Sequence, residues 1–316
     1  METDLYLKID NLKSKFDRVH SFYHKYAIEA LIFVLEDYLG IPDIGFKKHV
    51  EKQTWYTQLK HIRNIRYHNS FKNLINDNYK LVSNMIIPYA IENSRKIELH
   101  RDSYIEFNDC LRIISDFLMY VSPNLYNMFC DLYRSNHILF SERSSGGCEL
   151  FENKKDSIYI IIGSLNTVDD MANLVHELGH AYKDYNYQKS HKYYKVNEVL
   201  ESEISSEVLE LMFLNYLIKN NICYNDAVYS FKHYHERIID DAKRLSKLDQ
   251  DYYNKSFISN LSYFIGRVVA CNYMINKDMS YEELINYAYK RNIIRLLQEL
   301  NIDHDKVLEK IREFHR

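Results

Sequence analysis

Two histidines and a glutamate stand close together in the segment NLVHELGHAYKDY, residues 173–185. On a helix, His176 and His180 lie one turn apart on the same face, so both imidazole rings can bind one metal ion. Glu177 is displaced around the helix, where its carboxylate can take a proton from a water molecule at the ion. Two imidazole ligands and a carboxylate base are the groups that a zinc hydrolase requires, so the pattern predicts a zinc site.

The alternative explanation of this motif is three polar residues on a solvated helix. A chain with 14 histidines contains HExxH by chance in roughly one case in twenty. The residues that surround the motif are apolar, however: Leu174, Val175, Leu178 and Ala181. Because ionisable groups on a buried helix are costly unless they are paired or bind a metal, these neighbours favour the metal site.

A catalytic zinc ion needs a third protein ligand, and the segment NEVLESEISSEVLELMFL, residues 197–214, can supply it. This expected helix has a core side (Leu200, Ile204, Val208, Leu211) and five glutamates (Glu198, Glu201, Glu203, Glu207, Glu210). Glu203 and Glu210 are two turns apart on one face, so one could bind the metal while the other orients a histidine. The alternative is an acidic solvated face, which suits Glu198 and Glu201 better than Glu203, because Glu203 adjoins the apolar residues.

Three stretches resemble the oligoendopeptidase F and thimet oligopeptidase family of zinc metallopeptidases. They are IYIIIGSLNTVDDMANLVHELGHAYKDY (158–185), LESEISSEVLE (200–210) and SNLSYFIGRVVA (259–270). The first is similar to the family's HExGH helix and the hairpin before it. The second is similar to its helix with two glutamates seven apart, which implies Glu203 as the third zinc ligand and Glu210 as its supporting partner. The third is similar to a segment that lines the family's cleft, where Tyr263 matches a tyrosine.

The resemblance also implies where a substrate binds. SSGGCEL, residues 144–150, resembles the family's edge strand upstream of the zinc helix. Gly146, Gly147 and Cys148 are therefore expected to pair with the backbone of an extended peptide, which would add a strand there.

The chain departs from the family in two respects. The resemblance runs from about residue 105 to about residue 275, near half of the chain, and much of the family's N-terminal half has no counterpart. The family also places a histidine before its late tyrosines, where this chain reads DYYNKSF. Tyr263 is the expected hydrogen-bond donor to the oxyanion, together with Tyr253 or Tyr252 in place of that histidine.

The composition predicts a mainly helical protein. The 316 residues include only 7 glycines and 3 prolines, which favours long helices and few hairpins. We expect a zincin-like metallopeptidase fold with a small antiparallel hairpin before the HExxH helix. The expected organisation is an N-terminal helical lobe, residues 1–140, and a catalytic zinc-binding lobe, residues 141–316, within one continuous globular unit.

Local patterns place the individual elements. Apolar residues at helical spacing predict a helix from Leu5 through Val19, and a second from Tyr26 to Tyr38. Helix starts are expected at Ser122, at Thr167 with Asp170, and at Ser280 with Glu283. The runs SSGGCELF and SIYIIIG, on either side of the polar ENKKD, predict the hairpin.

Charge and cysteine content limit the partners and the compartment. The net charge of -3 gives no global field for nucleic acid or membrane, and the basic residues within 47–72 are expected to be a solvated face. Five cysteines without disulfide spacing favour a reducing compartment. No signal peptide and no apolar run of about 18 residues is recognisable. The protein is expected to be cytoplasmic, with no nucleic-acid or membrane partner; its oligomeric state is left open.

The sequence thus predicts a zinc metalloendopeptidase that hydrolyses short or unstructured peptides. One Zn²⁺ per chain is held by His176, His180 and Glu203, and Glu177 is the general base. One alternative is a catalytically inactive relative that binds peptides or a partner protein. Another is a zinc hydrolase dedicated to one protein, or to a substrate other than a peptide.

Overall fold

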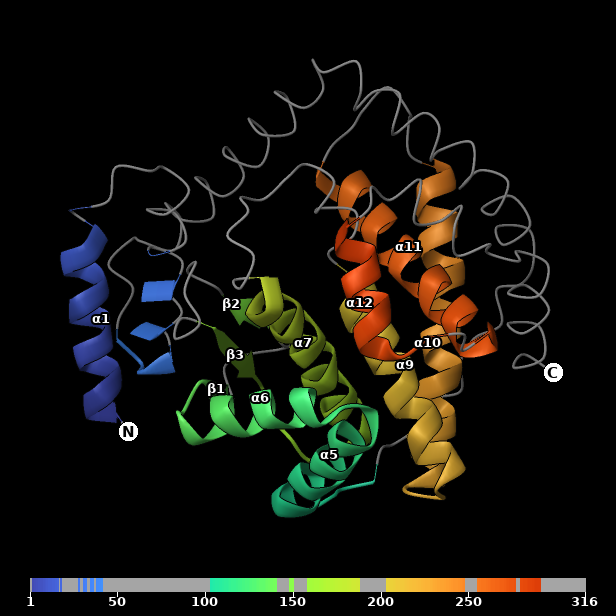
Figure 1. The fold of residues 1–316 in the computed structure, drawn as a ribbon, viewed down its shortest axis with the longest axis horizontal. Coiled ribbons are helices and arrows are strands. Elements are labelled where there is room, and N and C mark those ends of the chain that lie inside the picture. The colour runs from blue at the N-terminus through green and yellow to red at the C-terminus, as the bar shows by residue number, and fades with distance from the viewer. Residues whose placement is uncertain are drawn as a thin grey trace, which may run out of the picture.

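The computed structural model describes residues 2–16, 103–140, 148–150, 158–187, 203–247, 255–276 and 279–290, with scattered positions between 18 and 41. This part of the chain is mainly helical and has one small sheet, which confirms the predicted fold class (Figure 1). Its helices are α1 (Glu2–Phe16), α5 (Phe107–Val121), α6 (Pro123–Arg134), α7 (Val168–Tyr187), α9 (Ile204–Lys219), α10 (Tyr224–Lys247), α11 (Lys255–Asn276) and α12 (Tyr281–Lys290).

The sheet has three strands in the order β1-β3-β2, formed by Ile138–Phe140 (β1), Cys148–Leu150 (β2) and Tyr159–Ile162 (β3). β2 and β3 pair antiparallel, with Cys148 opposite Ile161, which confirms the predicted hairpin. β1 pairs parallel with the other side of β3, and the sequence pattern does not predict this strand. A strand of three residues has no readable alternation, and its parallel partner is distant in the chain, so local sequence carries little signal for it.

β3 lies between two hydrophobic cores, because successive side chains of a strand point to opposite faces of the sheet. Ile160 and Ile162 belong to the main core, which is shared with the helices from α5 onward. Tyr159 and Ile161 belong to a second core, which includes Leu5 and other residues of α1. Figure 1 accordingly shows α1 and α7 on opposite sides of the sheet. Burial on both faces explains the continuous apolar run YIII.

The three predicted helix starts are present. The Ser122 hydroxyl accepts hydrogen bonds from two backbone N–H groups at the start of α6. Asp170 N donates to Thr167 Oγ1 at 3.0 Å at the start of α7. Ser280 and Glu283 make the two reciprocal bonds of a capping box at the start of α12. The cap of α7 fixes where this helix begins and therefore which of its residues share a face.

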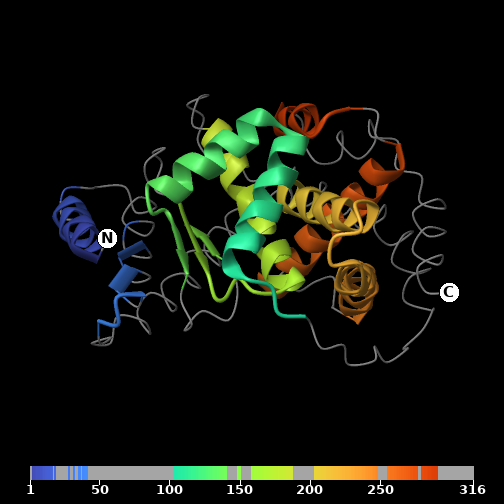
Figure 2. The ribbon, with the colours of Figure 1, turned by 90° about the horizontal axis from the view of Figure 1, so that it is seen from below.

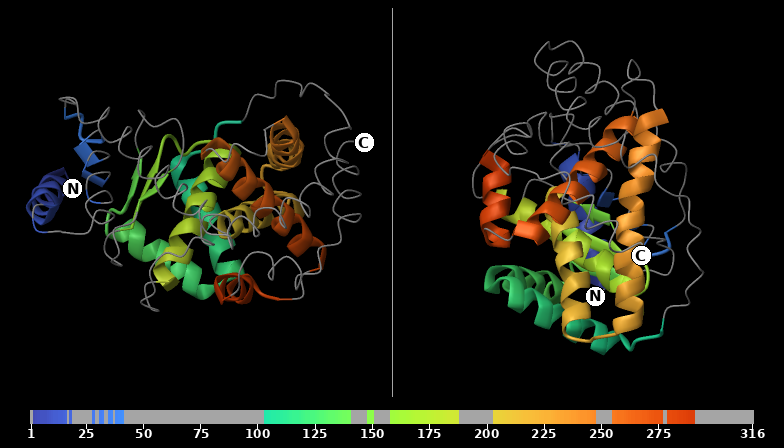
Figure 3. Two further views of the ribbon diagram at one scale, coloured as in Figure 1. Left: turned by 90° about the horizontal axis from the view of Figure 1, so that it is seen from above. Right: turned by 90° about the vertical axis from the view of Figure 1, so that its right-hand side faces the viewer.

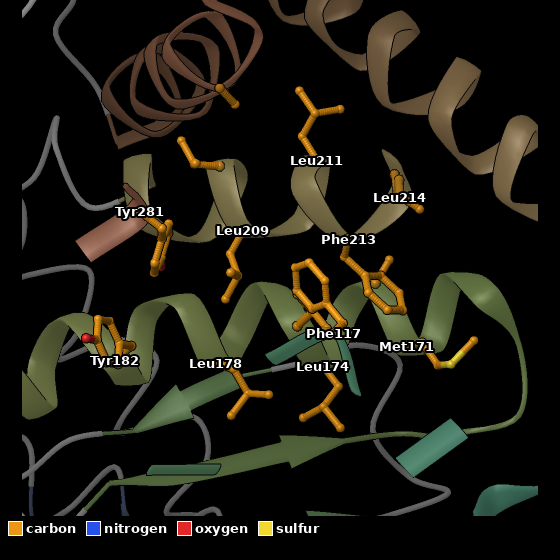
Figure 4. Packing of buried hydrophobic residues seen from close by; sticks show 14 of the residues in the cluster. Phe117, Met171, Leu174, Leu178, Tyr182, Leu209, Leu211, Phe213, Leu214 and Tyr281 are labelled. Atoms are coloured by element: carbon orange, nitrogen blue, oxygen red, sulfur yellow. The ribbon is translucent and has the colours of Figure 1, made fainter. Parts of the chain in front are cut away.

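The helix α7 lies between the sheet and α9 (Figure 4). Leu174 and Leu178 point from α7 toward the strands, whereas Leu209 points from α9 toward α7. Leu211 points from α9 to its opposite side, where α10 and α11 pack (Figures 1 and 3). All residues from 204 to 211 are consequently buried. The expected single core side of this helix is wrong for the described part of α9, because layers cover it on two sides.

α7 and α9 approach closely at Gly179, within the HELGH motif. A Cβ atom at this position would lie 2.5 Å from Ser206 Cα and 2.9 Å from Ser205 O. Both contacts are with the backbone of α9, which cannot move aside as a flexible side chain can. The glycine therefore lets the two helices that carry the candidate ligands pack against each other.

Replacing Gly179 with alanine should destabilise the protein. The added methyl group would force α7 and α9 apart, and such overpacking costs about 1–3 kcal/mol or more. Thermal unfolding followed by circular dichroism should show a clearly lower midpoint for Gly179→Ala. Asn173→Ala, at a partly exposed position of the same helix, is the control and should melt close to the wild type. Equal midpoints for the two variants would contradict the close approach.

The described N-terminal elements divide between the two cores. α5 and α6 contribute to the same core as α7 and α9, and Figure 2 shows them next to α7. α1 belongs to the core on the other face of the sheet. The proposed division into residues 1–140 and 141–316 stays a prediction.

Candidate zinc site

The three expected zinc ligands come together where α7 meets the start of α9. His176 and His180 lie one turn apart on α7, with ring centroids 5.0 Å apart. Glu203 precedes the first turn of α9, and its Oε2 lies 3.5 Å from His176 Nε2 and 3.3 Å from His180 Nε2. Two imidazole nitrogens and one carboxylate oxygen therefore face a common point.

These separations fit a tetrahedral zinc ion. Ligand atoms about 2.1 Å from a tetrahedral zinc ion are about 3.4 Å from one another. The two histidine–glutamate distances, 3.5 and 3.3 Å, agree with that value. His180 and Glu203 are partly exposed whereas His176 is buried, so the group is not sealed from solvent.

Glu210 contacts His176 from the side away from this point. Its Oε2 lies 2.9 Å from His176 Nδ1, which leaves Nε2 to face Glu203, and its other oxygen accepts a hydrogen bond from Arg237. Burial alone would raise the pKa of Glu210, but Arg237 and His176 lower it to about 2. Burial alone would lower the pKa of His176, but hydrogen bonds with Glu203 and Glu210 raise it well above its usual value. The negative field that favours a proton here also favours a metal cation.

Replacing Glu210 with glutamine should weaken zinc binding without abolishing it. The amide lacks the charge that polarises His176, and loss of such a supporting partner typically costs about 10–100-fold in metal affinity. Competition with a chromophoric chelator measures the effect. Asp169→Asn is the control, because Asp169 accepts a hydrogen bond from Ser230 at the start of α7, about two turns before His176. A Glu210→Gln affinity equal to that of this control would refute the orienting role.

A second group of atoms that could bind a metal comes from three buried residues, His176, Glu207 and Glu210. Arg237 donates to Glu210, and Arg267 Nη2 lies 3.2 Å from Glu207 Oε1 in an ion pair without hydrogen-bond geometry. Both carboxylates are thus already paired with arginine. The two guanidinium groups would repel a divalent cation bound by these carboxylates. The group formed with His180 and Glu203 is therefore the better candidate for zinc.

Tyr263 on α11 lies near the candidate site. Burial raises the pKa of Tyr263, and the negative charges of Glu203, Glu207 and Glu177 raise it further. Two of these carboxylates are those of the expected third ligand and the expected base. Its hydroxyl stays protonated near neutral pH, so it can donate a hydrogen bond to a developing oxyanion.

The approach of α11 to the site depends on Gly266. A Cβ atom there would lie 2.9 Å from Glu203 O and 3.1 Å from Glu203 Cβ. α11 can therefore lie against the start of α9 only because this position has no side chain. Tyr263 lies one turn earlier on α11, the helix that makes this contact with Glu203.

The structure does not describe the side chains of several predicted site residues. Gly146, Gly147, Tyr253, its alternative Tyr252 and the basic stretch 47–72 lie outside the described residues. Cys148 is described by its backbone, which pairs with Ile161 at the β2 edge of the sheet. The roles of these residues stay predictions.

Sequence reasoning missed a group of charges that pack next to the candidate zinc ligands. Besides Glu207, it comprises the buried residues Asp241 on α10 and Arg267 on α11, together with the partly exposed Arg237 on α10. Arg267 interrupts the apolar run FIGRVVA, which could have marked it as a buried charge. Its partners lie on other helices, so no local spacing identifies them.

Comparison with known proteins shows a likeness at the level of the fold. No model of a protein family matches the chain, and no curated protein matches it in sequence. A candidate peptidase from Chlamydophila abortus matches 95% of this chain at 15% identity, with a TM-score of 0.47. A candidate oligoendopeptidase F from Bacillus anthracis strain Ames matches 98% of this chain at 12% identity, with a TM-score of 0.50.

The chain spans 63% and 65% of the length of these two proteins, respectively. The match thus covers less than two thirds of each of these two proteins. The likeness to the Bacillus anthracis protein shows that this chain has an oligoendopeptidase-like fold.

Proposed function

We propose that this protein is a zinc-dependent metallopeptidase that cleaves short or unstructured peptides. The observation that carries the proposal is the convergence of His176 Nε2, His180 Nε2 and Glu203 Oε2, at separations of 3.5 and 3.3 Å. Glu177 adjoins the first ligand on the same helix, and Tyr263 lies on the helix that packs against Glu203. The oligoendopeptidase-like fold agrees with this assignment.

The proposed chemistry is hydrolysis of a peptide bond. Zinc at this site would supply a Lewis acid, which lowers the pKa of water toward neutrality and polarises the scissile carbonyl. Glu177 accepts a proton from the attacking water and returns it to the amine nitrogen as the C–N bond breaks. Tyr263 donates a hydrogen bond to the carbonyl oxygen as negative charge develops, and Tyr253 is proposed as a second donor. Glu210 holds the His176 ring in place.

The proposed substrate binds as an added strand. β2 ends the described sheet, in which it pairs with β3 alone, so its outer edge offers backbone groups to an extended peptide. Gly146, Gly147 and Cys148 are the residues proposed for this contact. Such pairing requires a substrate with free N–H and C=O groups, which unstructured peptides have along their length and folded proteins have only in exposed loops.

A length series of unstructured peptides around one cleavable bond tests this function. We expect the zinc-loaded protein to cut the short peptides, and kcat/KM should decline gradually as the peptides become longer. Mass spectrometry detects the cleavage products. Added chelator should stop cleavage and added zinc should restore it. A sharp cutoff in length would show that the cleft is enclosed. Inactivity on every peptide with zinc bound would favour a dedicated protein substrate or a binding protein.

The cytoplasm is the compartment that we propose. Cys110, Cys130, Cys223 and Cys271 are free thiols, as a reducing environment allows. No helix in the described ranges combines the length and apolar character needed to cross a membrane. Fractionation of the source cells, followed by immunodetection, would test the location.

A further inference from the structure

Arg267 is a buried arginine that contacts three helices at once. Its Nη2 lies 3.2 Å from Glu207 Oε1 on α9, and its Nη1 donates a hydrogen bond to Asp241 on α10. Its guanidinium carbon lies 5.1 Å from the centre of the Tyr263 ring, one turn earlier on α11. A single planar group therefore joins two neighbouring helices to the tyrosine that is the proposed oxyanion donor.

Stability alone is a poor explanation for this buried group. The side chains of Arg267, Glu207 and Asp241 are at most 8% exposed. Taking such charges out of water costs several kcal/mol each, and well-packed apolar residues of similar volume often give equal or greater stability. Burial raises the pKa of both Glu207 and Asp241, even though Arg267 lowers it, so the ion pairs do not fully offset the desolvation.

We propose that Arg267 is a positioning residue that fixes the Tyr263 ring at the active site, an inference that rests on the proposed function. The face of a guanidinium group can stack on an aromatic ring while its N–H edges bind carboxylates. Asp241 accepts a hydrogen bond from Nη1, and Glu207 attracts Nη2 from a second helix, so the two carboxylates together restrict the orientation of the guanidinium group. The ring against it is then restricted as well, and its hydroxyl is pre-organised as a donor.

A double-mutant cycle between Arg267 and Tyr263 tests this role. Lysine keeps the charge but lacks the planar face and the fork of donors. Tyr263→Phe should lower kcat about 100-fold, as expected for loss of an oxyanion donor. Arg267→Lys should lower kcat about tenfold, with KM changed less than about twofold and one zinc still bound per chain. In the Tyr263→Phe background, Arg267→Lys should have almost no further effect on kcat. Equal losses in both backgrounds would overturn the proposal.

Crystal structures of the same variants provide a readout that does not depend on activity. The Tyr263 ring should be displaced or spread over several positions in Arg267→Lys, while His176, His180 and Glu203 keep their places. Val268→Ala, a truncation at the next, buried position of α11, should leave both the ring and kcat unchanged. A Tyr263 ring that stays in place in Arg267→Lys refutes the positioning role.

A second variant and the activity of the wild type cover the cases in which Arg267→Lys does not fold or no peptide is cut. If Arg267→Lys does not fold, the combination Glu207→Gln, Asp241→Asn and Arg267→Gln removes the three charges together, so that neither carboxylate is left charged without Arg267. The same ring displacement is expected for this combination, and an unmoved ring would refute the role. Inactivity of the wild type on every peptide would instead be a failure of the proposed function, and the crystallographic comparison would still decide whether Arg267 fixes the ring.

Discussion

Replacing Glu177 with glutamine should lower the turnover of a cleaved peptide by about 10²–10⁴-fold and leave one zinc ion bound per chain. The amide has nearly the same size as the carboxylate but cannot accept a proton from the attacking water. Glu177 follows His176 on α7 and is buried, so the substitution changes the proton acceptor with little change in shape. Steady-state kinetics and elemental analysis of the same preparation measure the two effects.

The zinc content decides between two roles for this carboxylate. If Glu177→Gln lost zinc together with activity, Glu177 would have to be a metal ligand. If activity survived with zinc bound, another group would have to take the proton. Gly179→Ala serves as a comparison, because its expected defect is lower stability and not a change of the proton acceptor.

Replacing Glu203 with alanine should abolish stoichiometric zinc binding at micromolar metal. Glu203 supplies the oxygen that faces both His176 Nε2 and His180 Nε2, and two imidazoles alone leave the ion without its third protein ligand. The loss of affinity should exceed the roughly 10–100-fold loss expected for the supporting residue Glu210. Activity should fall in parallel, because the proposed reaction depends on the metal.

Glu201→Ala is the matched control for this substitution. Glu201 lies outside the described residues but stands two positions before Glu203, so on a continuous helix it would point in a different direction. We expect zinc binding by Glu201→Ala to equal that of the wild type. Equal losses in the two variants would mean that the third ligand is misassigned, and Glu207 would then be the next residue to test.

The elements that carry the candidate ligands could be predicted because their signals are local. Thr167 and Asp170 mark the start of α7, and a spacing of four residues puts His176 and His180 on one face. The hairpin of β2 and β3 follows from two apolar runs around a polar turn. Glu203 could be named as a third ligand only through the family resemblance, because five glutamates in one segment offer several choices.

The surroundings of the site could not be predicted, because they depend on helices that are distant in sequence. An acidic solvated face is the alternative that the sequence offers for the glutamates of residues 197–214, yet Glu207 is completely buried and pairs with Arg267 from α11. Asp241 joins the same group from α10. A single sequence shows that these residues are charged but not which of them meet. The parallel pairing of β1 with β3 could not be predicted either, because local sequence does not show which strands pair.

Anomalous diffraction at the zinc absorption edge, from crystals of the full chain grown with zinc, tests the central claim most directly. We predict one strong peak about 2.0–2.2 Å from His176 Nε2, His180 Nε2 and a Glu203 oxygen. That result would show that the three converging atoms form a metal site. A peak between His176 Nδ1, Glu207 and Glu210, or no peak in zinc-soaked crystals, would contradict the account.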